Sequence, residues 1–249
     1  LSLMRLVEFG GGTIAQGRLL FDQGDGRVID LARQSTPAMR DIRGNQIGMI
    51  FQEPMTSLNP LHTLEKQLGE SLALHQGLTG SRARARIVDL LTRVGIRDPE
   101  SRLADYPHQL SGGMQQRVGL ARALTSDPEI ILIDEPDSGL DPVRTSNLAQ
   151  LLVEVNTATD ATMLVVTHNI ELARTMPDNL GMLYRRELVM FGPREEFLLT
   201  DHPVVAQFMS GDPEGPIGMS EETDHRTADA YDGPLDYPDG GVGLRHAGA

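Results

Sequence analysis

Apolar residues recur along this chain with two different spacings, one typical of strands and one typical of helices. Short apolar runs bounded by turn-forming residues predict strands, and the longer uninterrupted runs fit strands that are covered on both faces. The predicted strands are residues 13–15, 18–21, 46–51, 130–133 and 162–167, and residues 180–190 predict a hairpin or strand pair.

Helical spacing dominates residues 62–124. Two apolar stripes are predicted there: Leu64, Leu68, Leu72 and Leu74 form the first, and Ile87, Leu90, Leu91 and Val94 form the second. Residues 1–8 also carry an apolar helical face, which three glycines at 10–12 interrupt. Asp141 followed by Pro142 predicts another helix start, because proline is preset for the first helical position. That helix is expected to run to about residue 156 and to bury Leu148, Leu151, Leu152 and Val155.

Strands that alternate with helices predict an α/β protein whose parallel sheet is joined by crossover helices. The helical block interrupts this alternation as an inserted subdomain, so four segments are expected. Residues 1–61 and 126–210 form the sheet-bearing core, residues 62–125 form the helical subdomain, and residues 211–249 form a tail. The tail holds nine acidic residues against two arginines and few large apolar ones, which predicts disorder.

Charge is distributed unevenly and argues against a nucleic-acid partner. The net charge is −13: residues 1–125 carry 15 basic and 12 acidic groups, whereas residues 126–249 carry 7 basic and 23 acidic groups. Sustained binding to nucleic acid needs clustered basic residues, and the second half offers the reverse. The chain has no cysteine, which excludes disulfides and thiolate metal sites, and no apolar stretch long enough to cross a bilayer.

Two local patterns carry candidate chemistry. Asp134 and Glu135 directly follow an apolar run, so a central strand would deliver two carboxylates to the carboxyl edge of the sheet, where ligands of open α/β sheets bind. Taken alone, this pattern fits a solvated acidic turn equally well. Ser111, Gly112 and Gly113 open a predicted helix, whose free N–H groups and partial positive charge suit a phosphate. The alternative is a simple N-capped helix, which the full octet at residues 110–117 makes less satisfactory.

These residues resemble the signature motif and the Walker B segment of ATP-binding cassette (ABC) ATPases, so a P-loop NTPase (RecA-like) fold is expected. The resemblance implies ATP and Mg²⁺ as cofactors, with Asp134 holding the ion through water and Glu135 polarising the attacking water. It further assigns Gln52 to the Q-loop near the metal, Asp141 to the D-loop and His168 to the switch histidine near the γ-phosphate. Ser111, Gly112, Gly113 and Gln115 are the implied nucleotide contacts of the signature motif.

One part of this family's pattern is missing from the sequence. A Walker A loop requires G-x-x-x-x-G-K followed by Ser or Thr, and the only lysine, Lys66, lies in a helical stretch without those glycines. Residues 1–8 resemble the helix that follows such a loop, so the chain resembles a cassette without its N-terminal strands and phosphate loop. We therefore expect no ATP turnover by these 249 residues alone.

Resemblance to importers divides along the chain. Residues 40–118 resemble the ATPase subunits of di- and oligopeptide importers, and residues 119–222 resemble actinobacterial ATPases of Mce-type lipid importers, as in a mosaic. The implied partners are membrane permease subunits, peptide-type by preference, and a second ABC ATPase subunit, at the cytoplasmic face of the inner or plasma membrane. Two alternatives stay open: a non-hydrolysing fragment that donates half a site in trans, and a soluble ABC ATPase unrelated to transport.

Overall fold

The structure is a computed structural model that describes residues 2–24, 26–51, 58–159 and 161–218. The chain divides into two compact units. The first comprises Leu1–Ser138 and Glu154–Val166, and the second comprises Gly139–Val153 and Thr167–Ala249. The helical block therefore belongs to the same unit as the strands around it, and the boundaries differ from the four segments expected from sequence.

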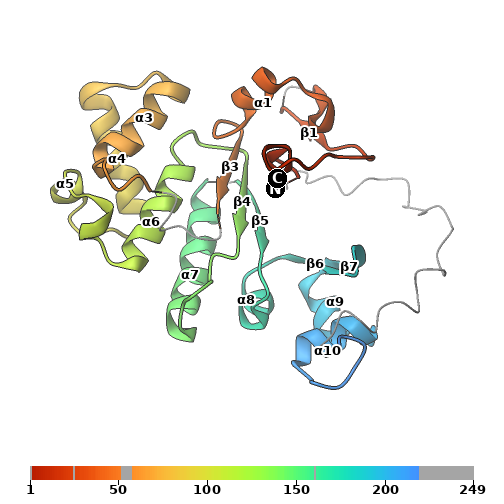
Figure 1. Cartoon of the computed structure of the whole chain (residues 1–249). Coiled ribbons are helices and arrows are strands. Elements are labelled where there is room, and N and C mark those ends of the chain that lie inside the picture. The colour runs from red at the N-terminus through yellow and green to blue at the C-terminus, as the bar shows by residue number, and fades with distance from the viewer. Residues whose placement is uncertain (1, 25, 52–57, 160, 219–249) are drawn as a thin grey trace. The chain divides into compact units, whose positions relative to one another are not determined.

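A three-stranded parallel sheet forms the centre of the first unit (Figure 1). Its order is β3 (Ile47–Ile50), β4 (Ile130–Asp134) and β5 (Thr162–Val166), with β4 in the middle. Three successive side chains of β4, at positions 131 to 133, are buried, as expected for an apolar strand covered on both faces. The parallel α/β prediction is confirmed.

The helical block contains α3 (Leu64–Gln76), α4 (Gly80–Arg93), the short α5 (Pro99–Arg102) and α6 (Gly112–Ala123). Both predicted stripes supply its core, with buried Leu64, Leu68, Leu72, Ile87, Leu90, Leu91 and Val94. Leu74 is the exception, because 78% of it is exposed. It lies two residues after Leu72, about 200° around a helix with 3.6 residues per turn, so the two side chains point to opposite faces. Its assignment to the stripe was wrong.

Local sequence fixes where α3 begins and ends. The Thr63 hydroxyl accepts a hydrogen bond from the Lys66 amide at 3.3 Å and caps the N-terminus. At the other end Gly77 adopts a left-handed conformation (φ 63°) and its amide donates to the Leu72 carbonyl. Both ends of the helix therefore lie where a neighbouring residue satisfies backbone groups that have no partner within the helix.

The N-terminal segment departs from its prediction. Residues 1–8 do not form an α-helix; a 3-10 helix, η1 (Leu6–Gly10), follows a turn. Arg5 precedes η1 with a left-handed φ of 50°, which no α-helix accommodates, and its guanidinium binds Glu8 at 2.8 Å. Residues 13–15 are not a strand, and the next strand is only β1 (Leu20–Asp22).

The remaining elements of this segment were not predicted because they are short: β2 (Val28–Asp30), η2 (Leu31–Arg33) and α1 (Thr36–Ile42). Strand β2 pairs antiparallel with β1. These pieces share one apolar cluster of Met4, Phe21, Leu31, Met39, Ile42, Ile47 and Leu132, which connects them to the central sheet. Tertiary burial, more than local propensity, therefore holds them in place.

The second unit confirms two sequence predictions. Helix α7 (Pro142–Thr159), which both units share, begins where predicted and extends three residues further, with Leu151, Leu152 and Val155 buried and Leu148 half-buried. The predicted hairpin is β6 (Asn179–Tyr184) paired with β7 (Glu187–Pro193). Three short helices were not predicted: α8 (Ile170–Thr175), α9 (Arg194–Leu199) and α10 (Pro203–Ser210). One face of the hairpin packs on Phe197, Val205 and Met209.

The predicted disordered tail falls partly on residues 219–249, which lie outside the described residues. Residues 211–218 are described, and the Gln207 side chain holds them in a defined loop. Its Nε2 donates to the Asp212 and Ile217 carbonyls, both at 3.2 Å, and its Oε1 accepts from the Ile217 amide at 2.7 Å. This loop is stabilised by a buried amide side chain, so the tail's composition did not predict its structure.

Candidate functional site

Two carboxylates lie at the carboxyl edge of the parallel sheet. Asp134 is the last residue of β4 and is paired in register with Val166 at the end of β5. Glu135 follows in a left-handed conformation (φ 43°), and its amide donates to the Val166 carbonyl at 2.8 Å. The Ser138 amide donates back to the Glu135 carbonyl at 3.1 Å, which closes a turn. Both acidic side chains are half-buried at the edge where α/β proteins bind ligands.

The Ser-Gly-Gly segment forms the N-terminus of α6. Ser111 is the N-cap, and its hydroxyl accepts from the Met114 amide at 3.4 Å. Ser111 and Gly112 are exposed, and apart from its chain neighbours and the backbone of its own helix, no atom lies within 4 Å of the position that a Cβ of Gly113 would occupy. Packing within this chain therefore does not require glycine at 113. The bare backbone leaves the helix terminus accessible to an anion.

Gln115 is placed differently from the expectation. Its side chain is buried, and its Nε2 donates to the Pro107 carbonyl at 2.8 Å and to the Leu110 carbonyl at 3.2 Å. These contacts hold the 3-10 helix η3 (Pro107–Gln109) and the loop that leads into α6. Gln115 therefore shapes the signature loop from inside, and its contact with nucleotide stays a prediction.

Asp141 and His168 belong to the second unit. Asp141 caps α7, since its Oδ1 accepts from the Arg144 amide at 3.0 Å and its Oδ2 pairs with Arg144 Nε at 3.2 Å. His168 is exposed in the segment between β5 and α8. Gln52 lies outside the described residues, and β3 ends two residues before it.

Lys66 is accounted for by its surroundings in α3. Its Nζ lies 3.0 Å from Nε2 of His62, on the exposed side of the helical block. The residues before it close a helix cap and do not form a glycine-rich loop. This geometry is consistent with the prediction that Lys66 does not act as the lysine of a phosphate loop.

No group of three or more metal-ligating side chains occurs among the described residues. A magnesium ion at this edge would therefore depend on water and on ligand oxygens in addition to Asp134. Mg²⁺ normally keeps several waters and takes one or two carboxylates together with substrate phosphates. The half-buried Asp134 at the strand end fits that mode of binding.

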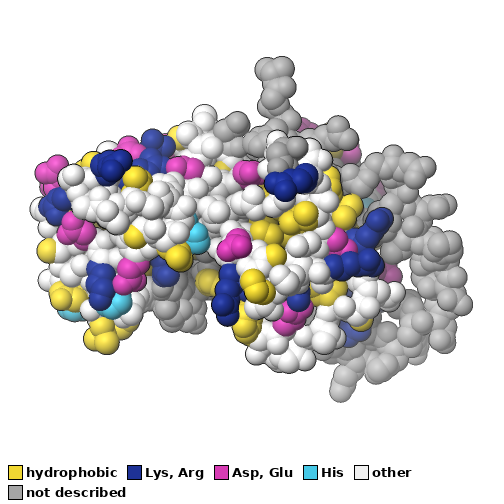
Figure 2. Space-filling view, turned by 90° about the horizontal axis from the view of Figure 1, so that it is seen from above, with side chains coloured by type: hydrophobic (Ala, Val, Ile, Leu, Met, Phe, Trp, Pro, Cys, Tyr) yellow, Lys and Arg dark blue, Asp and Glu magenta, His cyan; other side chains and the backbone are white. Residues whose placement is uncertain are grey.

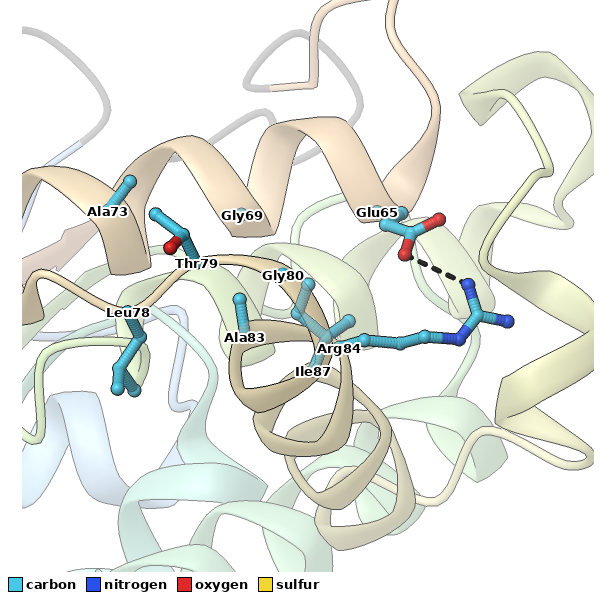
Figure 3. A pocket seen from close by; sticks show the side chains of 9 residues that line it. All are labelled: Glu65, Gly69, Ala73, Leu78, Thr79, Gly80, Ala83, Arg84 and Ile87. Carbon is cyan, nitrogen blue, oxygen red and sulfur yellow. Dashed lines mark hydrogen bonds and ion pairs between the residues drawn. The ribbon is translucent and has the colours of Figure 1, made fainter.

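A groove lies between α3 and α4 (Figure 3). Its volume is about 270 Å³, and an ion pair of 2.9 Å between Glu65 and Arg84 bounds it. Small side chains open it: Gly69, Ala73, Gly80 and Ala83. None of its lining residues belongs to the signature or Walker B segments, so this groove is not the nucleotide site.

Surface charge follows the mixed pattern of the first half of the sequence. On the face in Figure 2, basic and acidic side chains are interspersed over the described surface and do not gather into one large basic patch. Several charged groups of the described residues form ion pairs, for example Arg86 with Asp89 at 2.8 Å and Arg93 with Asp89 at 3.0 Å. No helix in the described parts of the chain is long and apolar enough to cross a membrane.

Sequence reasoning missed one residue near the site. Gln116, the neighbour of buried Gln115, donates from Nε2 to the Pro136 carbonyl at 3.2 Å. Two consecutive glutamines after the Ser-Gly-Gly turn were the available signal, because successive helical side chains differ by about 100° in direction. The sequence does not say which of the two faces the core.

Comparison with known proteins agrees with these motifs. A family model described as ABC transporter matches residues 13–138, just over half of the chain. A probable ribonucleotide transport ATP-binding protein of Mycobacterium tuberculosis is 48% identical over 198 residues, covering 80% of this chain and 54% of that protein. A putative peptide import ATP-binding protein of Brucella ovis is 41% identical over 204 residues, covering 82% of this chain and 60% of that protein.

Solved structures show the same fold. The ATP-binding cassette MJ0796, in a dimeric post-hydrolysis state bound to ADP and Pi, matches with a TM-score of 0.63 and 28% identity, over 78% of this chain and 79% of that one. The chain spans about half the length of the mycobacterial relative. With a parallel sheet that ends in Asp134, a capped Ser-Gly-Gly helix and this family match, the chain belongs to the ABC transporter family.

Proposed function

We propose that this chain acts as the ATP-binding subunit of an ABC importer and powers transport by ATP hydrolysis together with a second cassette. One observation carries the proposal: a single compact unit holds both an open helix terminus at Ser111–Gly113 and the Asp134–Glu135 pair at the carboxyl edge of a parallel sheet. The first suits an anionic phosphate and the second suits a hydrated Mg²⁺ ion with an attacking water.

Each residue has a defined part in this proposal. Asp134 holds Mg²⁺ through water, with Gln52 as a further ligand, and Glu135 polarises the attacking water. Ser111, Gly112 and Gly113 contact nucleotide phosphate from the helix terminus, and Asp141 and His168 act at the D-loop and near the γ-phosphate. Mg²⁺ supplies neutralisation of the phosphate charge when it is bound.

The 249 residues lack one requirement of that site, a phosphate loop. They contain no Walker A sequence, and Lys66 is placed on the helical block. The sheet could nevertheless accept a further strand. Strand β5 pairs with β4 on one side, and no described strand pairs with its other side.

A chain without a phosphate loop can still contribute to a shared site. In a head-to-tail dimer, one cassette supplies Walker A, Walker B, the glutamate and the histidine, and the other supplies the signature and the D-loop. We therefore infer that these 249 residues alone do not turn over ATP, and that Ser111–Gly113 and Asp141 complete one site when a complete cassette is the partner. In that pairing Asp134, Glu135 and His168 belong to the other site, which has no phosphate loop.

Mixing experiments test this proposal. The purified chain should show no Mg-ATP turnover, with or without Glu135→Gln, and a complete cassette of the same family should gain turnover when this chain is added. Ser111→Arg should abolish that gain, because the long arginine side chain would occupy the space at the helix terminus that phosphate needs. Ser81→Arg, at an exposed position of α4, is the matched control for added size and charge. Equal gains with Ser111→Arg and Ser81→Arg would refute the proposal.

For the membrane partner, we propose a peptide-type permease at the cytoplasmic face of the membrane. The support is the resemblance of residues 40–118, which include the helical block, to peptide importer ATPases. The Brucella ovis relative is named as a peptide import protein, whereas the mycobacterial relative is named for ribonucleotide transport. Co-purification from membranes tests the choice, and recovery of Mce-type permeases without a peptide permease would contradict it.

A further inference from the structure

Glu135 lies in a strained turn. Its φ of 43° is left-handed, a conformation that residues with a side chain rarely adopt and that persists only where neighbouring contacts enforce it. Two backbone hydrogen bonds contribute, from the Glu135 amide to the Val166 carbonyl and from the Ser138 amide to the Glu135 carbonyl. The second bond holds the Glu135–Pro136 peptide unit through its carbonyl, but neither bond contacts the Pro136–Asp137 peptide unit that comes next.

Gln116 supplies a contact at the Pro136–Asp137 peptide unit. Pro136 is buried and has no amide hydrogen, so its carbonyl is its one polar backbone group and needs a partner. The Gln116 Nε2 donates to this carbonyl at 3.2 Å. Gln116 itself is half-buried in α6, and Gln115 beside it is anchored to the Pro107 carbonyl, which fixes the rotation of the helix at this point.

We propose that Gln116 is a positioning residue for the catalytic carboxylate: by holding the Pro136 carbonyl, it fixes the turn that presents Glu135. The role of Glu135 as the catalytic carboxylate rests on the proposed function. Gln116 lies five residues after Ser111 on the same helix. A displacement of the signature helix is thereby transmitted to the Walker B turn of the same chain through one side-chain hydrogen bond.

Residue-resolved hydrogen exchange on the full chain tests the contact. Gln116→Met keeps the length and helix propensity of the side chain but removes the donor. Exchange at the Glu135 and Ser138 amides should become roughly fivefold faster, the ratio expected for loss of one neutral hydrogen bond. Exchange at the Val94 amide, which donates to Leu90 in the helical block, should not change. Gln16→Met, at an exposed coil position, is the control substitution.

A second variant separates the hydrogen bond from side-chain packing. Gln116→Glu has nearly the same shape, but its carboxylate cannot donate at neutral pH and regains a proton below about pH 4. Exchange at Ser138, corrected for intrinsic rates, should be fast at neutral pH and return toward wild type in acid, whereas Gln116→Met should show no such recovery.

Either of two results overturns the inference: unchanged exchange at Glu135 and Ser138 in Gln116→Met, or the same pH profile for Gln116→Met and Gln116→Glu. Neither readout depends on ATP turnover. A failed mixing experiment would remove the proposed function, on which the catalytic role of Glu135 rests, and leave the hydrogen-bond result standing. Conversely, restored turnover with unchanged exchange would remove only the role of Gln116.

Discussion

Replacement of Gly113 by alanine separates stability from function at the signature helix. Gly113 is in α6 with no atom within 4 Å of the position that a methyl group would occupy, and it is not among the residues with positive φ. Alanine therefore fits the folded chain without strain and reduces the conformational freedom of the unfolded chain. The expected gain in unfolding free energy is about 0.4–1 kcal/mol. With a urea dependence near ~2 kcal/mol/M, the midpoint should rise by about 0.2–0.5 M.

The same methyl group should damage the proposed site. It projects from the terminal turn of α6, where phosphate would approach the bare backbone, and a displacement of about 1 Å costs on the order of 10²-fold in rate. Turnover gained on mixing with a complete cassette should therefore fall by that order, although the variant is more stable. Stability and activity should thus change in opposite directions.

Gly69→Ala is the matched control. Gly69 lies inside α3, and its added methyl would meet only Ile87 Cδ1 at 3.9 Å, an ordinary contact. This variant should gain similar stability with unchanged turnover in the mixture. A lower urea midpoint for Gly113→Ala would refute the packing argument, and full turnover by a stabilised Gly113→Ala would refute the phosphate-binding argument.

Three more substitutions probe the helical core, the cap of α7 and the single lysine. Leu72→Ala should lower the unfolding free energy by about 2–5 kcal/mol in urea titrations, while exposed Leu74→Ala should change it by less than about 0.5 kcal/mol; equal losses would restore Leu74 to the core. Asp141→Ala should lower the free energy of unfolding by about 1 kcal/mol in thermal melting, because α7 loses its N-terminal cap. Asp141→Ser should recover most of that free energy, and an unchanged free energy in Asp141→Ala would contradict the capping role. Lys66→Met should leave turnover of the mixture unchanged in the ATPase assay, and a large loss would show that this lysine serves the nucleotide after all.

Much of the fold was readable from local pattern. The apolar run at residues 130–133 predicted a central strand, and β4 is the middle strand of the sheet. Asp141 followed by Pro142 predicted the start of α7 because capping depends only on neighbouring residues. The helix predicted for residues 1–8 is not formed. Arg5 adopts a left-handed conformation, and its side chain binds Glu8, which the apolar pattern does not reveal.

For the candidate site, too, some features were predictable from sequence and others were not. Sequence by itself determined that Ser111 caps a helix, because the capping hydrogen bond reaches only three residues ahead. It also indicated that a strand runs up to Asp134, because the apolar run stops there, although the strand's pairing partners lie far away in the sequence. Only the tertiary structure decided that Gln115 faces inward, that Gln116 reaches Pro136 twenty positions further along, and that Leu74 faces solvent. Helical periodicity gives relative directions around an axis, but packing against distant segments fixes which direction is the core.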